Sequence, residues 1–170
     1  MPTVIPSATN WDLSYDLLKL LVSECIASVA GDNFVDGFDG TAEANKFHLF
    51  PDYLPDMPDF AGSVVTQQDE MEPTNPVRRA SATVLLRAPS EPETGDLSGR
   101  RWATQAAECI ALYIRQQTGE YRTLVTMASG RQLLSFHAAR IVPIGEDNAQ
   151  RWVHSVLFEF TYTEHENTGG

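Results

Sequence analysis

The segment at residues 32–43, DNFVDGFDGTAE, has the most specific spacing of metal-ligating residue types in the chain. When it is aligned with the calcium-loop pattern D-x-[DN]-x-[DN]-G-x5-E, Asp32, Asp36, Gly37 and Glu43 fall at positions one, five, six and twelve. Position three is Phe34, which offers no oxygen ligand, and no second helix–loop–helix unit follows. We therefore expect a turn rich in Asp and Gly, and the sequence leaves calcium binding by this segment open.

The histidines and hydroxyl side chains form no recognisable catalytic arrangement. His48, His137, His154 and His165 lack metal-ligand spacing, and His154 lies on an apolar strand face, which is typical of a hydrogen-bonded core histidine. Ser135 and His137 share a strand face, but no acidic partner for a triad is identifiable. The motifs G-x-S-x-G, G-x-x-x-x-G-K-[ST] and G-x-G-x-x-G do not occur. We expect no enzyme, no cofactor and no metal.

The composition is that of a folded domain with a negative surface. The chain has 170 residues, of which 42% are hydrophobic, enough for one core, and we expect a single domain over residues 1–170. Its net charge of −11 opposes specific or non-specific binding to nucleic acid and to anionic membranes. No leader peptide or membrane segment is expected. Cys25 and Cys109 lie in apolar periodic segments, which favours free thiols in a reducing cytoplasm over a disulfide.

The negative charge is concentrated in one stretch. Residues 31–75 carry ten acids against Lys46 alone, whereas residues 76–170 carry ten acids and ten arginines. We expect a long ordered acidic loop at 31–62, anchored by aromatic residues, and a projecting acidic hairpin tip at 69–76. The Arg78–Arg79 and Arg100–Arg101 pairs favour salt bridges to an acidic neighbour. Oppositely charged patches of this kind suit a head-to-tail contact between identical copies.

The hydrophobic periodicity predicts an α+β fold with a mixed, mainly antiparallel sheet of about five strands covered by two helices. One helix is expected from Trp11 to about Val29, and its additional leucines predict contact with its own sheet and with something else. The second is expected at about 98–117. Strands are expected at 63–68, 77–88, 121–128, 131–142 and 149–163, with the face from Trp152 to Tyr162 in the core. Residues 164–170 form a polar tail.

The sequence resembles the tail-terminator proteins of long-tailed bacteriophages, which are also described as minor capsid or tail completion proteins. The resemblance covers about residues 10–163 and lies in the order of the segments WDLSYDLLKLLVSECIASV, VRRASATVLLRAP, RRWATQAAECIALYIRQQ, RTLVTM, SFHAARIVPIGED and RWVHSVLFEFTYT. It is a pattern of architecture and not a catalytic fingerprint. It implies an α+β subunit that assembles into a hexameric ring in the virion neck, after synthesis in the host cytoplasm.

In that family the ring sits on the head-proximal end of the tail tube, ends tube polymerisation and joins the tail to the head connector. The resemblance thus implies three protein partners: other copies of this chain, the tail tube protein and the connector or stopper protein. DNA would pass through the lumen without specific binding. The large 31–62 loop leaves a role as a head–tail connector or stopper component open. In a different class, the alternative is a small ligand- or metal-binding domain with its site around Phe47, His48 and Tyr53.

The candidate interface or lumen residues are either acidic, basic or aromatic members of the segments described above: Asp69, Glu70, Glu72, Arg78, Arg79, Phe47 and Tyr53. A channel for DNA benefits from a lumen that repels phosphate, and acids of the hairpin tip or of the 31–62 loop would supply that repulsion. We expect the tip or the loop to face the channel or an adjacent ring.

Overall fold

A computed structural model describes residues 9–27, 31–32, 34–43, 46–57, 60–69, 77–88, 99–117, 125–149 and 151–163. These residues form two helices, a seven-stranded sheet and a separate two-stranded pair. The helices are α1 (Thr9–Glu24) and α2 (Gly99–Gln116). The strands are β1 (Ile26–Ala27), β2 (Gly31–Asp32), β3 (Phe34–Asp36), β4 (Phe47–Pro51), β5 (Ala61–Gln68), β6 (Val77–Ala88), β7 (Val125–Thr126), β8 (Gln132–Glu146) and β9 (Trp152–Thr163).

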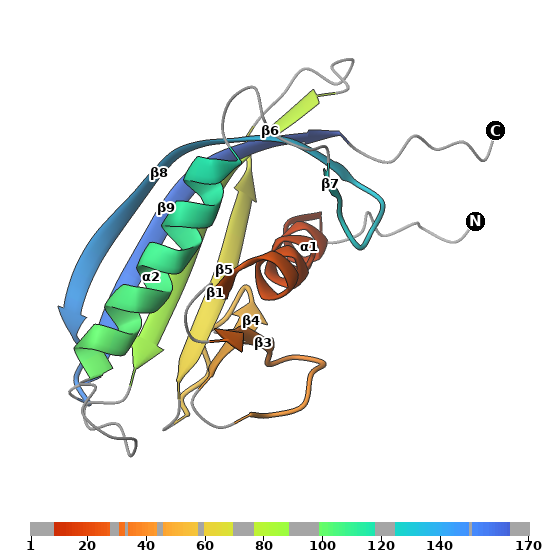
Figure 1. The fold of residues 1–170 in the computed structure, drawn as a ribbon. Coiled ribbons are helices and arrows are strands. Elements are labelled where there is room, and N and C mark those ends of the chain that lie inside the picture. Colours follow the sequence, from red (N-terminus) through yellow and green to blue (C-terminus); the bar gives the residue numbers. More distant parts are fainter. Residues whose placement is uncertain are drawn as a thin grey trace.

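Both helices cover the same face of the sheet (Figure 1). The strand order is β3-β4-β5-β6-β9-β8-β7, with β3, β4 and β5 parallel to one another and every other pairing antiparallel. Helix α1 packs on β3, β4 and β5, and α2 packs on β6, β8 and β9. The expected α+β fold with a mainly antiparallel sheet under two helices is therefore confirmed, with seven strands in place of about five.

The additional strands come from the segment that was expected to be a loop. Within residues 31–62, β3 and β4 form a parallel pair and β4 continues the parallel pairing to β5. Three of the first four residues of β4 are buried, namely Phe47, His48 and Leu49, so the strand shows no alternation of buried and exposed positions. A strand that is buried on both faces lacks the period of two, which is why the sequence pattern did not predict it.

Helix α1 is shorter than predicted and buries its leucines against its own sheet. It ends at Glu24, before Val29, and the backbone N–H of Cys25 makes the last helical hydrogen bond to Leu21. The buried leucines are Leu13, Leu17, Leu18, Leu20 and Leu21. All of them lie in the core of this chain. Beyond its sheet, α1 contacts the turn before β8 through Asp16, and contact of α1 with a partner subunit stays a prediction.

The other helix is packed closely by its small residues. The side chains of Ala103, Ala106, Ala107 and Ala111 are buried beneath α2, together with Ile110 and Ile114. Alanines bring the helix backbone near the sheet and leave room for large aromatic side chains on the strands. On β8 and β9, Phe136 contacts Phe158 and Phe160 with ring centroids 5.5 and 6.4 Å apart. The face of β9 expected in the core is indeed buried from His154 to Tyr162.

Strand β8 is the long outer strand of this half, and its geometry is irregular. Its pairing with β9 has three register shifts, and residues 138 and 145 have positive φ angles of 54° and 108°. Among the described residues β7 pairs only with Gln132 and Leu133, so the rest of β8 has no strand on its outer side there. Bulges and positive φ angles increase the twist of the strand, and they interrupt the row of backbone N–H and C=O groups with which another strand would pair.

The two cysteines carry thiols, form no disulfide, and lie where the two helices approach one another. Cys25 is buried, Cys109 is half-buried, and the Sγ of Cys109 lies 3.8 Å from the backbone oxygen of Cys25. A hydrogen bond with Cys109, together with burial, raises the pKa of the Cys25 thiol. No helix in the described part of the chain is both long enough and apolar enough to cross a membrane.

Candidate functional site

The two aromatic residues predicted for a surface site lie in different environments. Phe47 is 2% exposed, and its ring packs against Phe34 and Phe60 with centroids 6.2 and 5.2 Å apart. It therefore belongs to the core and offers no surface to a partner. Tyr53 is 44% exposed, and its ring lies 5.3 Å from that of Phe50. Of this pair, only Tyr53 is available for a contact with another molecule.

The charged candidates lie along the paired strands β5 and β6. Asp69 is exposed, and its backbone N–H donates to the carbonyl of Arg79 at 3.0 Å. Arg79 is exposed on the uncovered face, whereas Arg78 is half-buried. Glu70 and Glu72, and with them nearly all of the predicted hairpin tip at 69–76, lie outside the described residues.

The 32–43 segment contains a turn that is organised by Asp36. The Oδ1 of Asp36 accepts from the backbone N–H groups of Phe38 and Asp39 at 2.9 and 3.0 Å, and its Oδ2 accepts from the Tyr15 hydroxyl at 2.8 Å. Burial and this hydrogen bond raise the pKa of Tyr15 to about 12. The Oε2 of Glu43 forms an ion pair with the Nζ of Lys46 at 3.0 Å. No three metal-ligating side chains gather anywhere in the part of the chain that the structure describes.

His48 was the proposed centre of an alternative ligand site, and both of its ring nitrogens are occupied. Its Nδ1 lies 3.1 Å from the carbonyl oxygen of Phe60, and its Nε2 accepts from the backbone N–H of Glu43 at 3.1 Å. Because Nε2 accepts, the proton is on Nδ1, where it is donated to Phe60. His48 thus links Glu43 to Phe60 and has no nitrogen left for a ligand.

Ser135 and His137 are brought together on the uncovered face of the sheet. The Ser135 Oγ lies 2.7 Å from the Nε2 of His137 and 2.5 Å from the Oγ1 of Thr161. The cross-strand neighbour of His137 is Glu159, an acidic residue that the sequence analysis did not identify. His137 and Glu159 are exposed to water, which competes for their hydrogen bonds. These side chains form a polar strip on the sheet surface rather than an enclosed reactive site.

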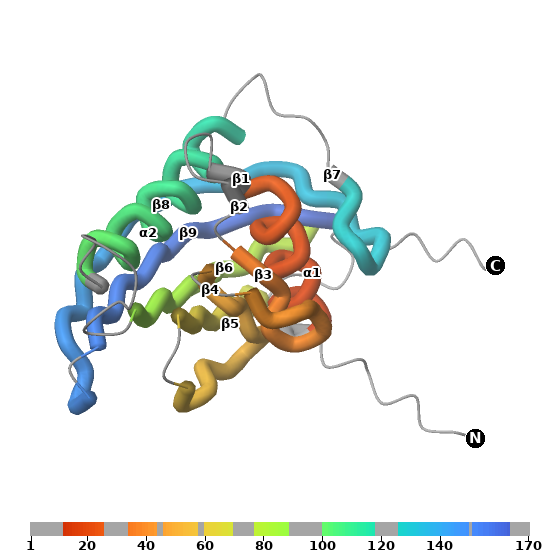
Figure 2. Tube along the Cα trace, turned by 60° about the horizontal axis from the view of Figure 1, so that its bottom comes forward, coloured from red at the N-terminus to blue at the C-terminus, as the bar shows by residue number. Residues whose placement is uncertain are grey.

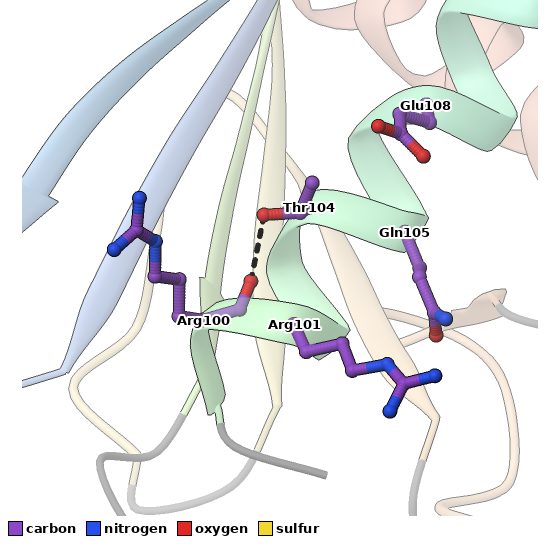
Figure 3. A pocket seen from close by; sticks show the side chains of 5 residues that line it. All are labelled: Arg100, Arg101, Thr104, Gln105 and Glu108. Carbon is purple, nitrogen blue, oxygen red and sulfur yellow. Dashed lines mark hydrogen bonds between the residues drawn. The ribbon is translucent and has the colours of Figure 1, made fainter.

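A shallow hollow on the outer side of α2 is lined by one helix face (Figure 3). Its lining residues are Arg100, Arg101, Thr104, Gln105 and Glu108. The hydroxyl of Thr104 donates to the backbone oxygen of Arg100 at 2.8 Å and lies 3.2 Å from the Nε2 of His154. The hollow is open, and its charged side chains lie on the helix surface, so nothing in it excludes water or converges on a ligand.

A buried ion pair joins α1 to the turn before β8. Asp16 and Arg131 are each 4% exposed, and the Nη1 of Arg131 lies 3.2 Å from the Oδ2 of Asp16. The same carboxylate accepts from the backbone N–H of Ser129 at 2.9 Å and from the Ser129 hydroxyl. With its oxygens satisfied inside the fold, this cluster fixes the turn on the helix and is structural.

Charge differs between the two sides of the sheet. Described residues from 9 to 57, which include α1, β3 and β4, contain nine acidic and two basic side chains, a formal charge of −7. Described residues from 77 to 163, which include β6, α2, β8 and β9, contain nine arginines and four acids. Over residues 76–170 of the full sequence, ten arginines are balanced by ten acids, so this part of the chain has no net charge. The side of the sheet that carries β3 and β4 is therefore acidic, whereas the side that carries the C-terminal half of β8 bears arginines balanced by acids (Figures 1 and 2). The ion pairs Asp16–Arg131 and Asp56–Arg151 join the two sets of elements.

Exposed apolar side chains accompany the charges on both sides. Phe38 is 51% exposed on the turn after β3 and Tyr53 is 44% exposed after β4, whereas Val142 and Ile144 are 39% and 58% exposed on β8. Gly37, the neighbour of Phe38, lies against the Phe50 ring, which packs on Tyr53. Exposed aromatic and aliphatic side chains on otherwise charged surfaces are typical of protein contact sites. This pair of surfaces, one at each side of the sheet, is the strongest candidate functional feature of the described structure.

No protein-family model and no curated protein matches this sequence.

The contact residues on β8 could not be identified from the sequence. Val142 and Ile144 belong to a run, IVPIGED, that has the apolar content of an ordinary buried strand end. They are exposed because this part of β8 has no described neighbour on its outer side, and position in the sheet cannot be read from local sequence. The only signal was Pro143, since proline inside a strand pattern indicates an edge.

Proposed function

We propose that the protein is a structural virion component that assembles with copies of itself into a ring at the head-proximal end of a phage tail tube. In this role it ends tube polymerisation and joins the tail to the head connector. The chain works through shape and charge complementarity and carries out no chemical reaction. The observation that carries the proposal is the pair of different exposed surfaces at the two sides of the sheet, with Phe38 and Tyr53 among acids on one side and Val142 and Ile144 beside Arg140 on the other.

A pair of this kind supports ring assembly because its two surfaces differ. An isologous contact needs the same patch on both subunits, whereas two different, complementary patches produce head-to-tail contacts, which give a ring when the rotation between copies closes and a filament when it does not. The α+β fold, with two helices on one face of the sheet, agrees with the architecture that the resemblance implies. The exposed acid Asp69 fits a lumen or ring surface that repels the phosphates of passing DNA.

The proposal is tested on the virus by removing the protein during assembly. Loss of the terminator is expected to give tail tubes of uncontrolled length that fail to join heads, visible by negative-stain electron microscopy. Purified protein added to growing tubes should bind at one end and stop further growth. Tubes of normal length that join heads in its absence would refute the terminator role.

Native mass spectrometry in low salt separates the proposal from the ligand-binding alternative. A closed ring of identical subunits supports assembly, whereas a monomer whose melting temperature rises with calcium or a metabolite supports a ligand-binding domain. A stopper component differs from a terminator in what it binds. Attachment to the head connector in the absence of tail tubes would assign the chain to the connector side of the neck.

A further inference from the structure

The turn that follows β3 and the segment that follows β4 carry the residues of a surface that we call the acidic edge. We define it as Phe38, Asp39 and Glu43 after β3 and Tyr53 after β4. All four side chains are exposed. The Phe38 ring packs edge-to-face on Tyr15 with centroids 5.6 Å apart, which holds it in place on the surface. The turn itself is fixed by the hydrogen bonds to Asp36. The aromatic side chains of the acidic edge are therefore held in position among carboxylates before any partner binds.

The opposite side of the sheet carries a second surface, which we call the aliphatic edge and define as Arg140, Val142 and Ile144. These residues lie on the C-terminal half of β8, and all three are exposed. In both views this part of β8 lies on the side of the molecule away from α1 and β3 (Figures 1 and 2). One chain thus presents its acidic edge and its aliphatic edge in different directions.

The structure of β8 also determines how a partner can contact it. Pro143 has no backbone N–H, and register shifts occur between His137 and Arg140 and between Pro143 and Gly145. These features prevent another strand from extending the sheet along this part of β8. A partner must therefore be bound through side chains. Val142 and Ile144 supply apolar area, and Arg140 supplies a positive charge.

We propose that the acidic edge of one copy packs against the aliphatic edge of the next copy, with Phe38 and Tyr53 on Val142 and Ile144 and with Asp39 and Glu43 facing Arg140. This inference rests on the proposed ring assembly and names the surfaces through which it occurs. A second copy is the occupant because it carries both halves of the match. The acids of one edge, Asp39 and Glu43, are opposite in charge to Arg140 of the other. The acidic edge exposes aromatic side chains and the aliphatic edge exposes aliphatic ones.

The test uses two full-length variants that each block one edge, Phe38→Asp and Ile144→Asp. Each variant alone is expected to stay monomeric under low-salt conditions in which the wild-type chain assembles, with association weakened at least about 30-fold per contact, as is typical for a lost central contact. An equal mixture has one intact contact, between the aliphatic edge of Phe38→Asp and the acidic edge of Ile144→Asp. It is therefore expected to give dimers and nothing larger.

Leu112→Asp is the matched control, since Leu112 is 55% exposed on α2, outside both edges. It is expected to assemble as the wild type does. Sedimentation velocity measures the assembly state, and thermal unfolding shows that each variant is folded. The wild-type assembly is also expected to weaken as salt is raised, because added ions screen the charges.

Three results would overturn the inference: either single variant assembles like the wild type, the mixture remains monomeric, or the wild-type chain is monomeric at millimolar concentration in low salt. The proposed function is tested separately, by measuring the length of tails assembled with and without the protein. If the protein still ends tubes while Phe38→Asp and Ile144→Asp form rings, the edges are wrong and the function stands. If the edges mediate rings but tail length is normal without the protein, the edges are right and the function is wrong.

Discussion

Replacing Asp16 by alanine should destabilise the protein more than any surface substitution. Asp16 lies on α1 and holds Arg131 and both donors of Ser129, and its side chain is 5% exposed. Alanine removes the carboxylate and leaves the buried Arg131 guanidinium without it. Removing one partner of a buried ion pair typically costs about 3–5 kcal/mol. That is a large share of a total stability of about 5–15 kcal/mol.

Urea unfolding followed by circular dichroism measures this loss, and thermal unfolding should show a melting temperature lowered by roughly 6–20 °C for a chain of this size. Glu24→Ala is the control, because Glu24 is an exposed acid on the same helix. Its effect should stay within about 0.5 kcal/mol. Replacing both partners with apolar residues, Asp16→Leu with Arg131→Met, should recover part of the loss, since no buried charge remains. A cost below about 1 kcal/mol for Asp16→Ala would refute the reasoning.

Three further predictions concern other buried groups. Burial lowers the pKa of His154, whereas an unfolded histidine has a pKa of about 6.5, so unfolding takes up a proton below that pH. The urea midpoint of the wild type should therefore fall relative to that of His154→Gln as the pH is lowered from about 7 to about 5.5. Parallel pH profiles of the two proteins would contradict this. Gly62→Ala should destabilise by about 1–3 kcal/mol, because its Cβ would lie 2.9 Å from the backbone oxygen of Leu85; an unchanged melting temperature would show that the strands move apart freely. Cys109 should react with a thiol reagent before Cys25, whose thiol is buried and has a raised pKa; mass spectrometry of the labelled peptides measures the order, and labelling of Cys25 first would show the core opening there.

The parts of the fold that sequence predicted are those with long, regular periods. Strand β6 was predicted at 77–88 and is observed as Val77–Ala88, because twelve residues alternate between a packed and a partly solvated face. Helix α2 was predicted within a residue of its ends, since buried alanines and isoleucines recur at helical spacing up to Ile114. The buried face of β9 was predicted for the same reason.

The parts that sequence missed depend on partners distant in the chain. The β3–β4 pair is short and parallel, and β4 is buried on both sides, so neither strand shows an alternating pattern. The periodic stripe of α1 continues past Glu24, but the chain leaves the helix there and Ile26 pairs with Asp32. For the candidate site, the charge imbalance was visible in the sequence. The exposure of Phe38 and Ile144 was not, because it depends on which strands lie at the sides of the sheet.

The division of the covered face between two helices has a consequence for the order of folding. Helix α1 covers strands that follow it directly in the chain, β3 to β5, and these elements leave the ribosome before β6, α2, β8 and β9 are complete. The N-terminal part can begin to condense during synthesis, since its contacts are local. The bond between Arg131 and Asp16 joins residues 115 positions apart. That contact forms only after most of the chain has emerged, so it is made late and fixes α1 to the turn before β8.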